Sequence, residues 1–186
     1  MHRRYLDPRA PSGGRRSKKG GPPHEPADHA LGRSRGGWGS KLHLTCDARG
    51  TITAFRLTAG QIQECTQAIA LLESVHIGRR RRPRHLAGDR AYATVAVRQW
   101  GQQHHVQLSI PERVDHVRHR RRYRLPAPAF DPAAYRGRNV IERAVGWFKH
   151  ARRLASRAEK LATHYRALLA LALSIRYANC YLSDTT

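Results

Sequence analysis

The feature that most constrains the fold is a long stretch without proline near the C-terminal end, residues 135–182. Alanine, leucine and arginine dominate this stretch, and these residues have high intrinsic helix propensity. Without proline, every residue of the stretch can donate its backbone N–H to a helical hydrogen bond. The sequence therefore predicts two helices here, with a joint near residues 156–163.

The region before these helices shows the patterns of strands. Leu42, Leu44 and Cys46 alternate with polar residues, residues 47–50 supply turn chemistry, and residues 51–57 are rich in β-formers, which predicts a β-hairpin. The same kind of pattern predicts further elements: a helix over 64–75, a charged loop over 79–84, a short strand over 85–89, a helix over 93–104, a strand over 106–110 and a long basic loop over 112–134. Strands followed by helices predict an α/β fold with a mixed sheet and flanking helices.

The N-terminal segment differs in composition from the rest of the chain. Residues 1–37 are rich in glycine, proline and arginine and have almost no apolar periodicity, so they bury too little surface to offset the entropy of ordering. We expect residues 1–37 to be disordered or loop-like. Residues 38–182 are expected to form one domain, as the length of 186 residues suggests.

The charge balance is strongly positive. Lysine and arginine number 35 against 13 aspartates and glutamates, a formal net charge of +22, which points to a polyanionic partner. No apolar run approaches the roughly 20 residues that a membrane-spanning helix needs. The basic N-terminus is not followed by the apolar stretch of a secretory signal. We therefore expect no membrane association and a cytoplasmic location.

Four polar residues near the start of the C-terminal stretch share a helix face. On a helical wheel, Tyr135, Arg138, Glu142 and Lys149 fall within an arc of about 60°, opposite a stripe of apolar residues. From spacing alone, a second interpretation stays open. The face could be solvated, with Arg138 and Glu142 forming an ordinary i,i+4 ion pair.

The order Tyr135-(2)-Arg138-(3)-Glu142-(6)-Lys149 resembles the Y-(2)-R-(3)-E-(6)-K signature of bacterial insertion-sequence DDE transposases. Other segments of the chain resemble the same family: GRSRGGWGSKLHL at 32–44, LTAGQ at 57–61, LAGDRAY at 86–92 and RNVIERAVGWFKHARRLASRAEKLATHYRALLALA at 138–172. The resemblance covers roughly residues 25–178. It implies a ribonuclease-H-like catalytic core.

In this family, three carboxylates hold two divalent cations, Mg²⁺ or Mn²⁺, at a DNA phosphate, and such hard cations take oxygen ligands. By resemblance, Asp89 is the second catalytic carboxylate and Glu142 the third. Without the family, Asp89 would more simply be a capping or ion-pairing residue. The resemblance also implies that Tyr135, Arg138 and Lys149 bind DNA near the scissile phosphate, where arginine and lysine suit phosphate oxygens.

The sequence departs from the family where the first aspartate should lie. The family has a stretch resembling DGTSIRAHQAAAGAKKGG before the GRSRGG segment, whereas this chain has RRYLDPRAPSGGRRSKKGG. With suitable synonymous codons, the family stretch read two nucleotides later translates as RYLDPRAPSGGR, which is residues 4–15. Asp7 precedes a proline in a turn-like setting, so the catalytic role is not transferred to it. We expect a truncated or frame-disrupted core whose first strand and first aspartate are missing.

The function expected from the resemblance is DNA transposition by metal-dependent DNA strand cleavage and strand transfer, lost in this chain with its first aspartate. DNA, as insertion-sequence ends and target, is the expected partner, and a homodimer the expected assembly. The alternative is a non-catalytic basic protein that binds nucleic acid through charge alone, with arginine clusters at 79–84 and 118–124.

Overall fold

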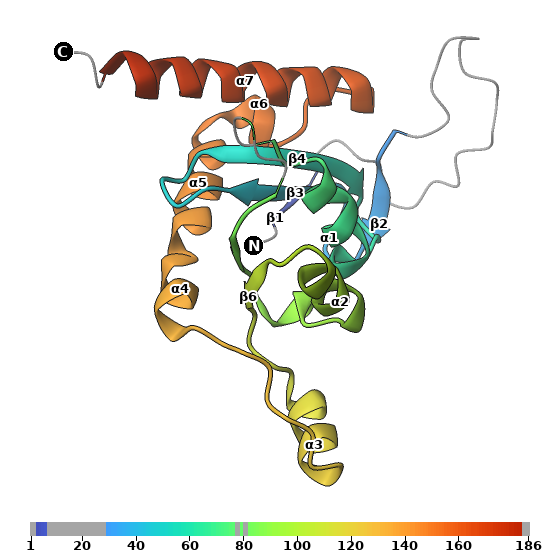
Figure 1. Cartoon of the computed structure of the whole chain (residues 1–186). Coiled ribbons are helices and arrows are strands. Elements are labelled where there is room, and N and C mark those ends of the chain that lie inside the picture. The colour runs from blue at the N-terminus through green and yellow to red at the C-terminus, as the bar shows by residue number, and fades with distance from the viewer. Residues whose placement is uncertain (1–2, 7–28, 77–78, 80–81, 184–186) are drawn as a thin grey trace. The chain divides into compact units, whose positions relative to one another are not determined.

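The computed structural model describes residues 3–6, 29–76, 79 and 82–183 (Figure 1). The chain divides into two compact units: unit 1 contains residues 43–56 and 63–146, and unit 2 contains residues 3–42, 57–62 and 147–186. The elements, in chain order, are β1 (Arg3–Leu6), β2 (Gly32–Ser34), β3 (Gly37–Cys46), β4 (Ile52–Ala59), α1 (Glu64–Glu73), β5 (His85–Ala87), the 3₁₀ helix η1 (Arg90–Tyr92), α2 (Val95–Gln103), β6 (Gln107–Ser109), α3 (Val114–Arg122), α4 (Pro132–Gly137), α5 (Asn139–His150), α6 (Arg152–Ala155) and α7 (Ala162–Ser183).

Strand β3 is the centre of a four-stranded sheet. It pairs antiparallel with β1, where Arg3 lies opposite Leu42, and with β2, where Ser34 lies opposite Gly37. It also pairs with β4. Five consecutive side chains of β3 are buried, among them Lys41 and His43, so this strand is covered on both faces.

The β3–β4 hairpin agrees with the prediction for residues 41–57. Its turn is held by the Asp47 carboxylate, whose Oδ1 accepts hydrogen bonds from the backbone N–H groups of Arg49 and Thr51, both at 2.9 Å. Gly50 has a φ of 89°, a conformation that glycine adopts without the steric cost of a Cβ. The hydroxyls of Thr45 and Thr53 lie 2.9 Å apart across the two strands.

The prediction that residues 1–37 are disordered or loop-like is wrong in two places, because β1 and β2 both lie within that range. The expectation that the family's first strand and first aspartate are missing stays a prediction, because no finding identifies β1 with that strand. Pairing with β3 supplies backbone hydrogen bonds that local composition does not reveal, so apolar periodicity was a poor guide here. Residues 7–28 of the predicted segment lie outside the described residues.

Unit 1 contains the second sheet, in which β5 and β6 pair in parallel. Helices α1 and α2 pack beside this pair around the buried Leu72, Trp100 and Val106. Helix α2 begins where Thr94 Oγ1 accepts a hydrogen bond from the backbone N–H of Val97, a standard N-cap. The helices and strands predicted between residues 64 and 110 are therefore confirmed, with ends that differ by a few residues, whereas residues 80–81 of the predicted charged loop lie outside the described residues. Parallel and antiparallel pairings both occur, which confirms the predicted α/β class with mixed strand directions and flanking helices.

Residues 112–134 are not the long loop that their prolines and arginines predicted, because they contain α3 and the start of α4. Helix α3 has Asp115 in its first turn and four basic residues in its last turn, and both suit the helix dipole. Helix α4 begins at Pro132, and Asp131 caps it by accepting hydrogen bonds from two backbone N–H groups. The charge of this segment hid its helical signals.

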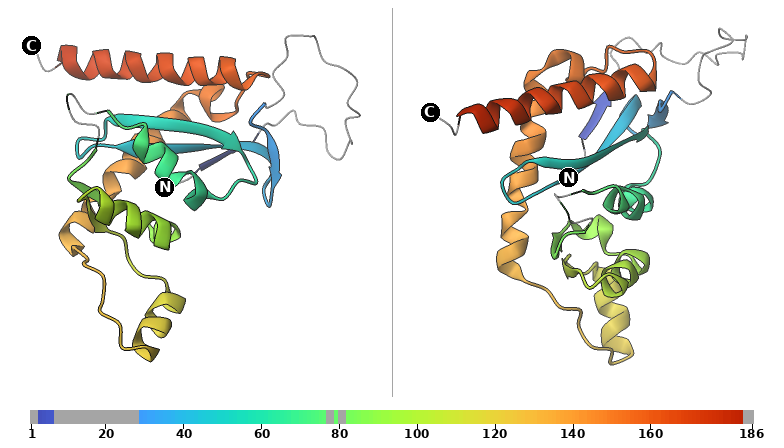
Figure 2. Two further views of the ribbon diagram at one scale, coloured as in Figure 1. Left: turned by 45° about the vertical axis from the view of Figure 1, so that its right-hand side comes forward. Right: turned by 45° about the horizontal axis from the view of Figure 1, so that its top comes forward.

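The C-terminal stretch forms more helices than the two predicted. Helix α4 extends into it, and α5, α6 and α7 follow, with breaks at Ala151 and between Ala155 and Ala162. The second break lies at the predicted joint, where Arg157 adopts a φ of 46°. Figure 2 shows α7 as a long, nearly straight helix. In the part of the chain that the structure describes, every helix is too short or too polar to serve as a membrane span.

Candidate functional site

Asp89 lies just after strand β5, at the C-terminal edge of the parallel β5–β6 pair. The backbone N–H of Gly88 still donates to the Ser109 carbonyl at 3.3 Å, which extends the pairing up to Asp89. The Asp89 carboxylate then caps η1, because its Oδ1 accepts a hydrogen bond from the backbone N–H of Ala91 at 2.9 Å. One carboxylate oxygen of Asp89 thus acts as the helix cap, a role that the sequence left open.

Tyr92 is the aromatic neighbour of Asp89. Its side chain packs against the buried cluster of Ala68, Ala93, Val97 and Ile110. Burial, and secondly the negative charge of Asp89, raise the pKa of the Tyr92 hydroxyl well above its ordinary value. The phenol therefore stays neutral beside the Asp89 carboxylate, and sequence analysis did not find this pair.

Three of the four signature residues form a continuous row in unit 1. The Arg138 guanidinium donates to Glu142 Oε1 at 3.2 Å, and its carbon Cζ lies 5.5 Å from the centre of the Tyr135 ring. The Phe130 ring also lies near Tyr135, with the two ring centres 5.5 Å apart. The predicted shared face therefore exists for Tyr135, Arg138 and Glu142.

The backbone that carries this row is two helices, whereas the wheel assumed one. Tyr135 belongs to α4, Arg138 is the C-cap residue of α4, and Glu142 lies in the first turn of α5. Arg138 keeps right-handed helical angles, φ −55° and ψ −23°, so the row survives the change of helix. Lys149 lies in α5, but its side chain is outside the described residues.

The opposite side of α5 is apolar, as predicted, with a small shift of the stripe. Ala144 and Phe148 are buried, whereas Val140, Trp147 and Ala151, which share the apolar side of the helical wheel, are only half-buried. Ile141 and Val145 are buried in addition. This packing leaves Glu142 on the accessible side of the helix, with 38% of its side chain exposed.

The topology of unit 1 connects the two candidate carboxylates. Helix α4, which carries Tyr135, packs beside strands β5 and β6, and β5 leads to Asp89. The 52 residues between Asp89 and Glu142 therefore leave and return to the same group of elements. The returning chain is held at the end of β6, because Ser109 Oγ accepts a hydrogen bond from the backbone N–H of Asp131 at 3.2 Å.

The described residues do not fit a site for two divalent cations. Within residues 3–6, 29–76, 79 and 82–183, no three side chains of aspartate, glutamate, histidine or cysteine come together as a metal-binding group. Asp89 caps a helix and Glu142 is paired with Arg138. Two metal ions in one site need bridging and terminal oxygen ligands from more than these two carboxylates.

One further arrangement of charged residues was missed by sequence analysis. The Arg120 Nε donates to both carboxylate oxygens of Glu112, at 3.2 and 3.1 Å. The pair joins a residue before α3 to a residue within it, so spacing along a single helix could not have found it.

Comparison with known proteins gives one match. A family model described as "Transposase DDE domain" matches residues 14–176, most of the chain. No curated protein and no solved structure matches it. The mixed α/β fold is consistent with the partial ribonuclease-H-like core that such a family implies. The chain therefore belongs to the transposase DDE domain family, whose activity is DNA transposition and whose partner is DNA.

Proposed function

We propose that this chain is a bacterial insertion-sequence transposase domain of the Y-R-E-K group that binds DNA through Tyr135, Arg138 and Lys149, with Glu142 in the same row as Tyr135 and Arg138. The observation that carries the proposal is the row itself, because the family signature and the contacts among its side chains coincide. Asp89 and Glu142 are then the second and third carboxylates of the inherited catalytic site.

Arg138 has the central role in this proposal. Its guanidinium has five N–H donors, and the contacts with Glu142 and the Tyr135 ring leave donors for a phosphate. Glu142 fixes the orientation of the guanidinium, and the Tyr135 ring supports its face. We place Lys149 at the same DNA backbone as a second cation, where its flexible stem carries a point charge.

We further propose that the chain, as it stands, binds DNA without cutting it. The family chemistry needs a cation pair, Mg²⁺ or Mn²⁺, and the described residues supply two carboxylates for it, Asp89 and Glu142. A shift of the reading frame over residues 4–15 would account for the loss of the first aspartate. Losing one carboxylate from a metal-dependent site lowers the rate by orders of magnitude.

The alternative function is non-catalytic binding of nucleic acid through charge alone. The net charge of +22 favours it, since arginine clusters release counterions from any phosphate backbone. A glutamate held by Arg138 on a basic face favours the transposase origin instead, because charge-driven binding gains nothing from an acid there.

The test is a strand-cleavage assay with the full chain, Mg²⁺ or Mn²⁺, and a labelled duplex carrying the DNA that flanks the reading frame. We expect no cleavage by the chain itself. Fusing residues from Lys18 onward to a family-type strand with its aspartate should restore cleavage, and Glu142→Gln in the fusion should abolish it. Cleavage by the unmodified chain that survives Asp7→Asn contradicts the frame-shift proposal. Cleavage that Asp7→Asn stops identifies Asp7 as the first aspartate.

For the assembly, we propose a homodimer, as two DNA ends must be held together in transposition. Light scattering coupled to size-exclusion chromatography, with and without duplex DNA, measures it. A mass of about 21 kDa without DNA, together with the mass of one chain per duplex in its presence, contradicts this proposal.

A further inference from the structure

Residues 110–131 form an excursion from unit 1, here called the arm. The arm leaves strand β6 at Ile110, contains α3, and returns at Asp131, whose backbone N–H donates to Ser109 Oγ. In Figures 1 and 2, α3 lies at the end of this excursion, away from α1, α2 and β6 of the same unit. The two ends of the arm are therefore tied together, while its helix extends into solvent.

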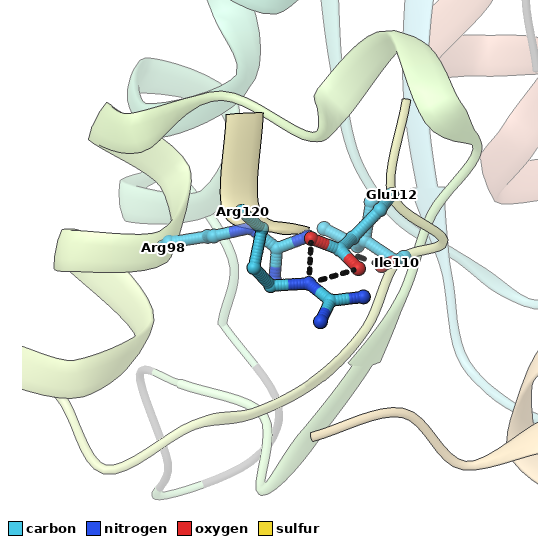
Figure 3. A network of polar contacts seen from close by, with 4 residues as sticks. All are labelled: Arg98, Ile110, Glu112 and Arg120. Carbon is cyan, nitrogen blue, oxygen red and sulfur yellow. Dashed lines mark hydrogen bonds and ion pairs between the residues drawn. The ribbon is translucent and has the colours of Figure 1, made fainter. Parts of the chain in front are cut away.

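The base of the arm is held by charged contacts (Figure 3). Arg120 binds both oxygens of Glu112 through its Nε, and the exposed fractions of the two side chains are only 25% and 18%. Beside them, the Arg98 guanidinium donates to the Ile110 carbonyl at 3.4 Å. Hydrogen bonds between charged groups are stronger than neutral ones, and partial burial limits their screening by salt. The Glu112–Arg120 pair thus fixes α3 relative to the start of the arm.

The arginines of α3 divide into two sets. His116, Val117 and Arg120 are half-buried and lie on one side of the helix. Arg118, Arg121 and Arg122 lie on the other side, at i, i+3 and i+4 spacing, and all three are exposed. Within the described residues, no carboxylate pairs with these three, whereas Arg113 pairs with Asp115 at 3.3 Å. Three uncompensated positive charges therefore face solvent along one helix.

We propose that the arm binds the phosphate backbone of duplex DNA through Arg118, Arg121 and Arg122, and that the Glu112–Arg120 ion pair is the positioning element that presents them. The proposal rests on the proposed function, in which DNA is the partner. Neighbouring helix residues at this spacing lie about 5–6 Å apart, so the three guanidinium groups can follow one strand of phosphates. Arg120 is excluded from this contact because Glu112 already satisfies it.

The charge of the arm favours DNA over a second copy of this chain as its binding partner. The arm also exposes apolar side chains, including 57% of Tyr123 and 49% of Leu125. A second copy, however, carries the same exposed arginines, so contact between two arms would bring like charges together. Duplex DNA supplies negative charge at regular spacing, and binding to its phosphate backbone does not depend on the base sequence.

The test is fluorescence anisotropy of a labelled duplex with the full chain, from 50 to 200 mM salt. We expect the triple substitution Arg118→Ala, Arg121→Ala and Arg122→Ala to reduce the slope of log affinity against log salt by about 2.7, which is 0.9 per lost phosphate contact. A matched control replaces three exposed arginines elsewhere, Arg49, Arg56 and Arg166, and removes the same charge. The control should change the slope by less than about 1.

The positioning role has its own test, because the two partners carry opposite charges. Glu112→Gln raises the net charge and Arg120→Gln lowers it, so a purely electrostatic effect predicts opposite changes in DNA affinity. Our proposal predicts that both substitutions lower the affinity by a similar factor, about fivefold, and that the double substitution is no worse. Opposite changes, with Glu112→Gln binding more tightly, overturn the positioning role.

The outcomes separate this proposal from the proposed function. If the unmodified chain shows no salt-dependent binding to duplex DNA, the proposed function itself fails. If it binds, but the arm and control triples lose equal slope, only the arm proposal fails. If the arm triple changes the mass in light scattering and leaves the DNA affinity intact, the arm is an interface between copies. Circular dichroism of each variant verifies that it remains folded.

Discussion

The arginines of the arm and Arg157 of unit 2 are the same side chain in opposite environments. Arg118, Arg121 and Arg122 are exposed on α3. Arg157 is 4% exposed, in the break between α6 and α7, and donates to the Ala30 carbonyl at 2.9 Å, to the His29 carbonyl and to the Ser40 hydroxyl. Each of these arginines adds one positive charge to the composition, but only Arg157 has its guanidinium bound to buried acceptors.

Positive charges in a basic protein therefore have different roles, which depend on whether they are buried or exposed. A buried guanidinium must have its donors satisfied, because desolvation of an unpaired charge costs more than any surface contact gains. Arg157 meets that need with backbone and hydroxyl oxygens and with the Tyr165 ring, whose centre lies 5.5 Å from its carbon Cζ. An exposed guanidinium keeps its hydration and remains available to a ligand. Arg157 is thus a structural residue, and the arm arginines are binding residues.

The largest expected effect is on Arg157. Arg157→Ala removes the buried guanidinium and its hydrogen bonds to the carbonyls of His29 and Ala30, and should lower the free energy of unfolding by about 3 kcal/mol or more. Urea denaturation followed by circular dichroism measures this loss. Arg121→Ala is the matched control and should stay within about 0.5 kcal/mol of the unmodified chain. Equal losses for the two variants would remove the distinction between the environments.

The next effect concerns Glu73, an exposed acid with ordered partners. The indole N–H of Trp100 donates to Glu73 Oε1 at 2.5 Å, while Arg82 lies 3.7 Å from the other oxygen. The hydrogen bond from Trp100, more than the charges of Arg82 and His104, holds the pKa of Glu73 below its ordinary value. Trp100→Phe should therefore cost more than about 1 kcal/mol, because it removes this hydrogen bond and part of a buried ring. Arg82→Ala should cost less than about 0.5 kcal/mol, because that pair is 44% exposed on both sides.

The pH dependence of Glu73 follows from the same shift. A carboxyl whose pKa is lowered in the folded state stabilises the protein at pH values above its unfolded pKa, and this contribution disappears as the pH falls through the lowered pKa. The difference in unfolding free energy between the unmodified chain and Glu73→Gln should thus be present at pH 7 and shrink below pH 4.5, the ordinary value. A difference that grows on acidification contradicts the assignment.

A smaller effect on stability is expected at the base of the arm. Glu112→Gln releases Arg120 and should speed hydrogen exchange of the α3 amides about tenfold, while the global free energy of unfolding changes by less than about 1 kcal/mol. Mass-spectrometric hydrogen exchange measures this local loosening. Arg121→Gln, one residue away on the exposed side, should leave the exchange of α3 unchanged. Equal exchange in both variants would show that the ion pair does not hold the arm.

The sequence predicted the elements whose signals are local. The β3–β4 hairpin and α1 follow from alternation, turn residues and helical spacing, all of which act within a few residues. Strand β1 depends on pairing with residues 39–42, more than 30 positions away, so its own composition could not reveal it. Helix α3 was hidden by its arginines, although its terminal charges suit a helix.

In the candidate site, too, local contacts could be predicted from the sequence and the others could not. The row of Tyr135, Arg138 and Glu142 could be predicted because its residues lie within eight positions of one another on helical backbone. The effect of Asp89 on Tyr92 could not be predicted, since it depends on the burial of Tyr92 against the core of unit 1. The Glu112–Arg120 pair depends on where the chain turns after β6. Spacing predicts contacts along one helix, whereas contacts across a turn need the fold.

The smallest effect on stability, and a direct test of the signature, is expected at Arg138. Its i,i+4 pair with Glu142 is partly exposed, so Arg138→Gln should cost only a few tenths of a kcal/mol of unfolding free energy. Arg143, exposed on the same helix, provides the matched control, because Arg143→Gln removes the same charge outside the row. If Arg138 contacts a phosphate beside Glu142, Arg138→Gln lowers the affinity for duplex DNA clearly more than Arg143→Gln does in anisotropy measurements. Charge-driven binding treats the two positions alike, so equal losses would favour the non-catalytic alternative over a DNA site inherited from a transposase.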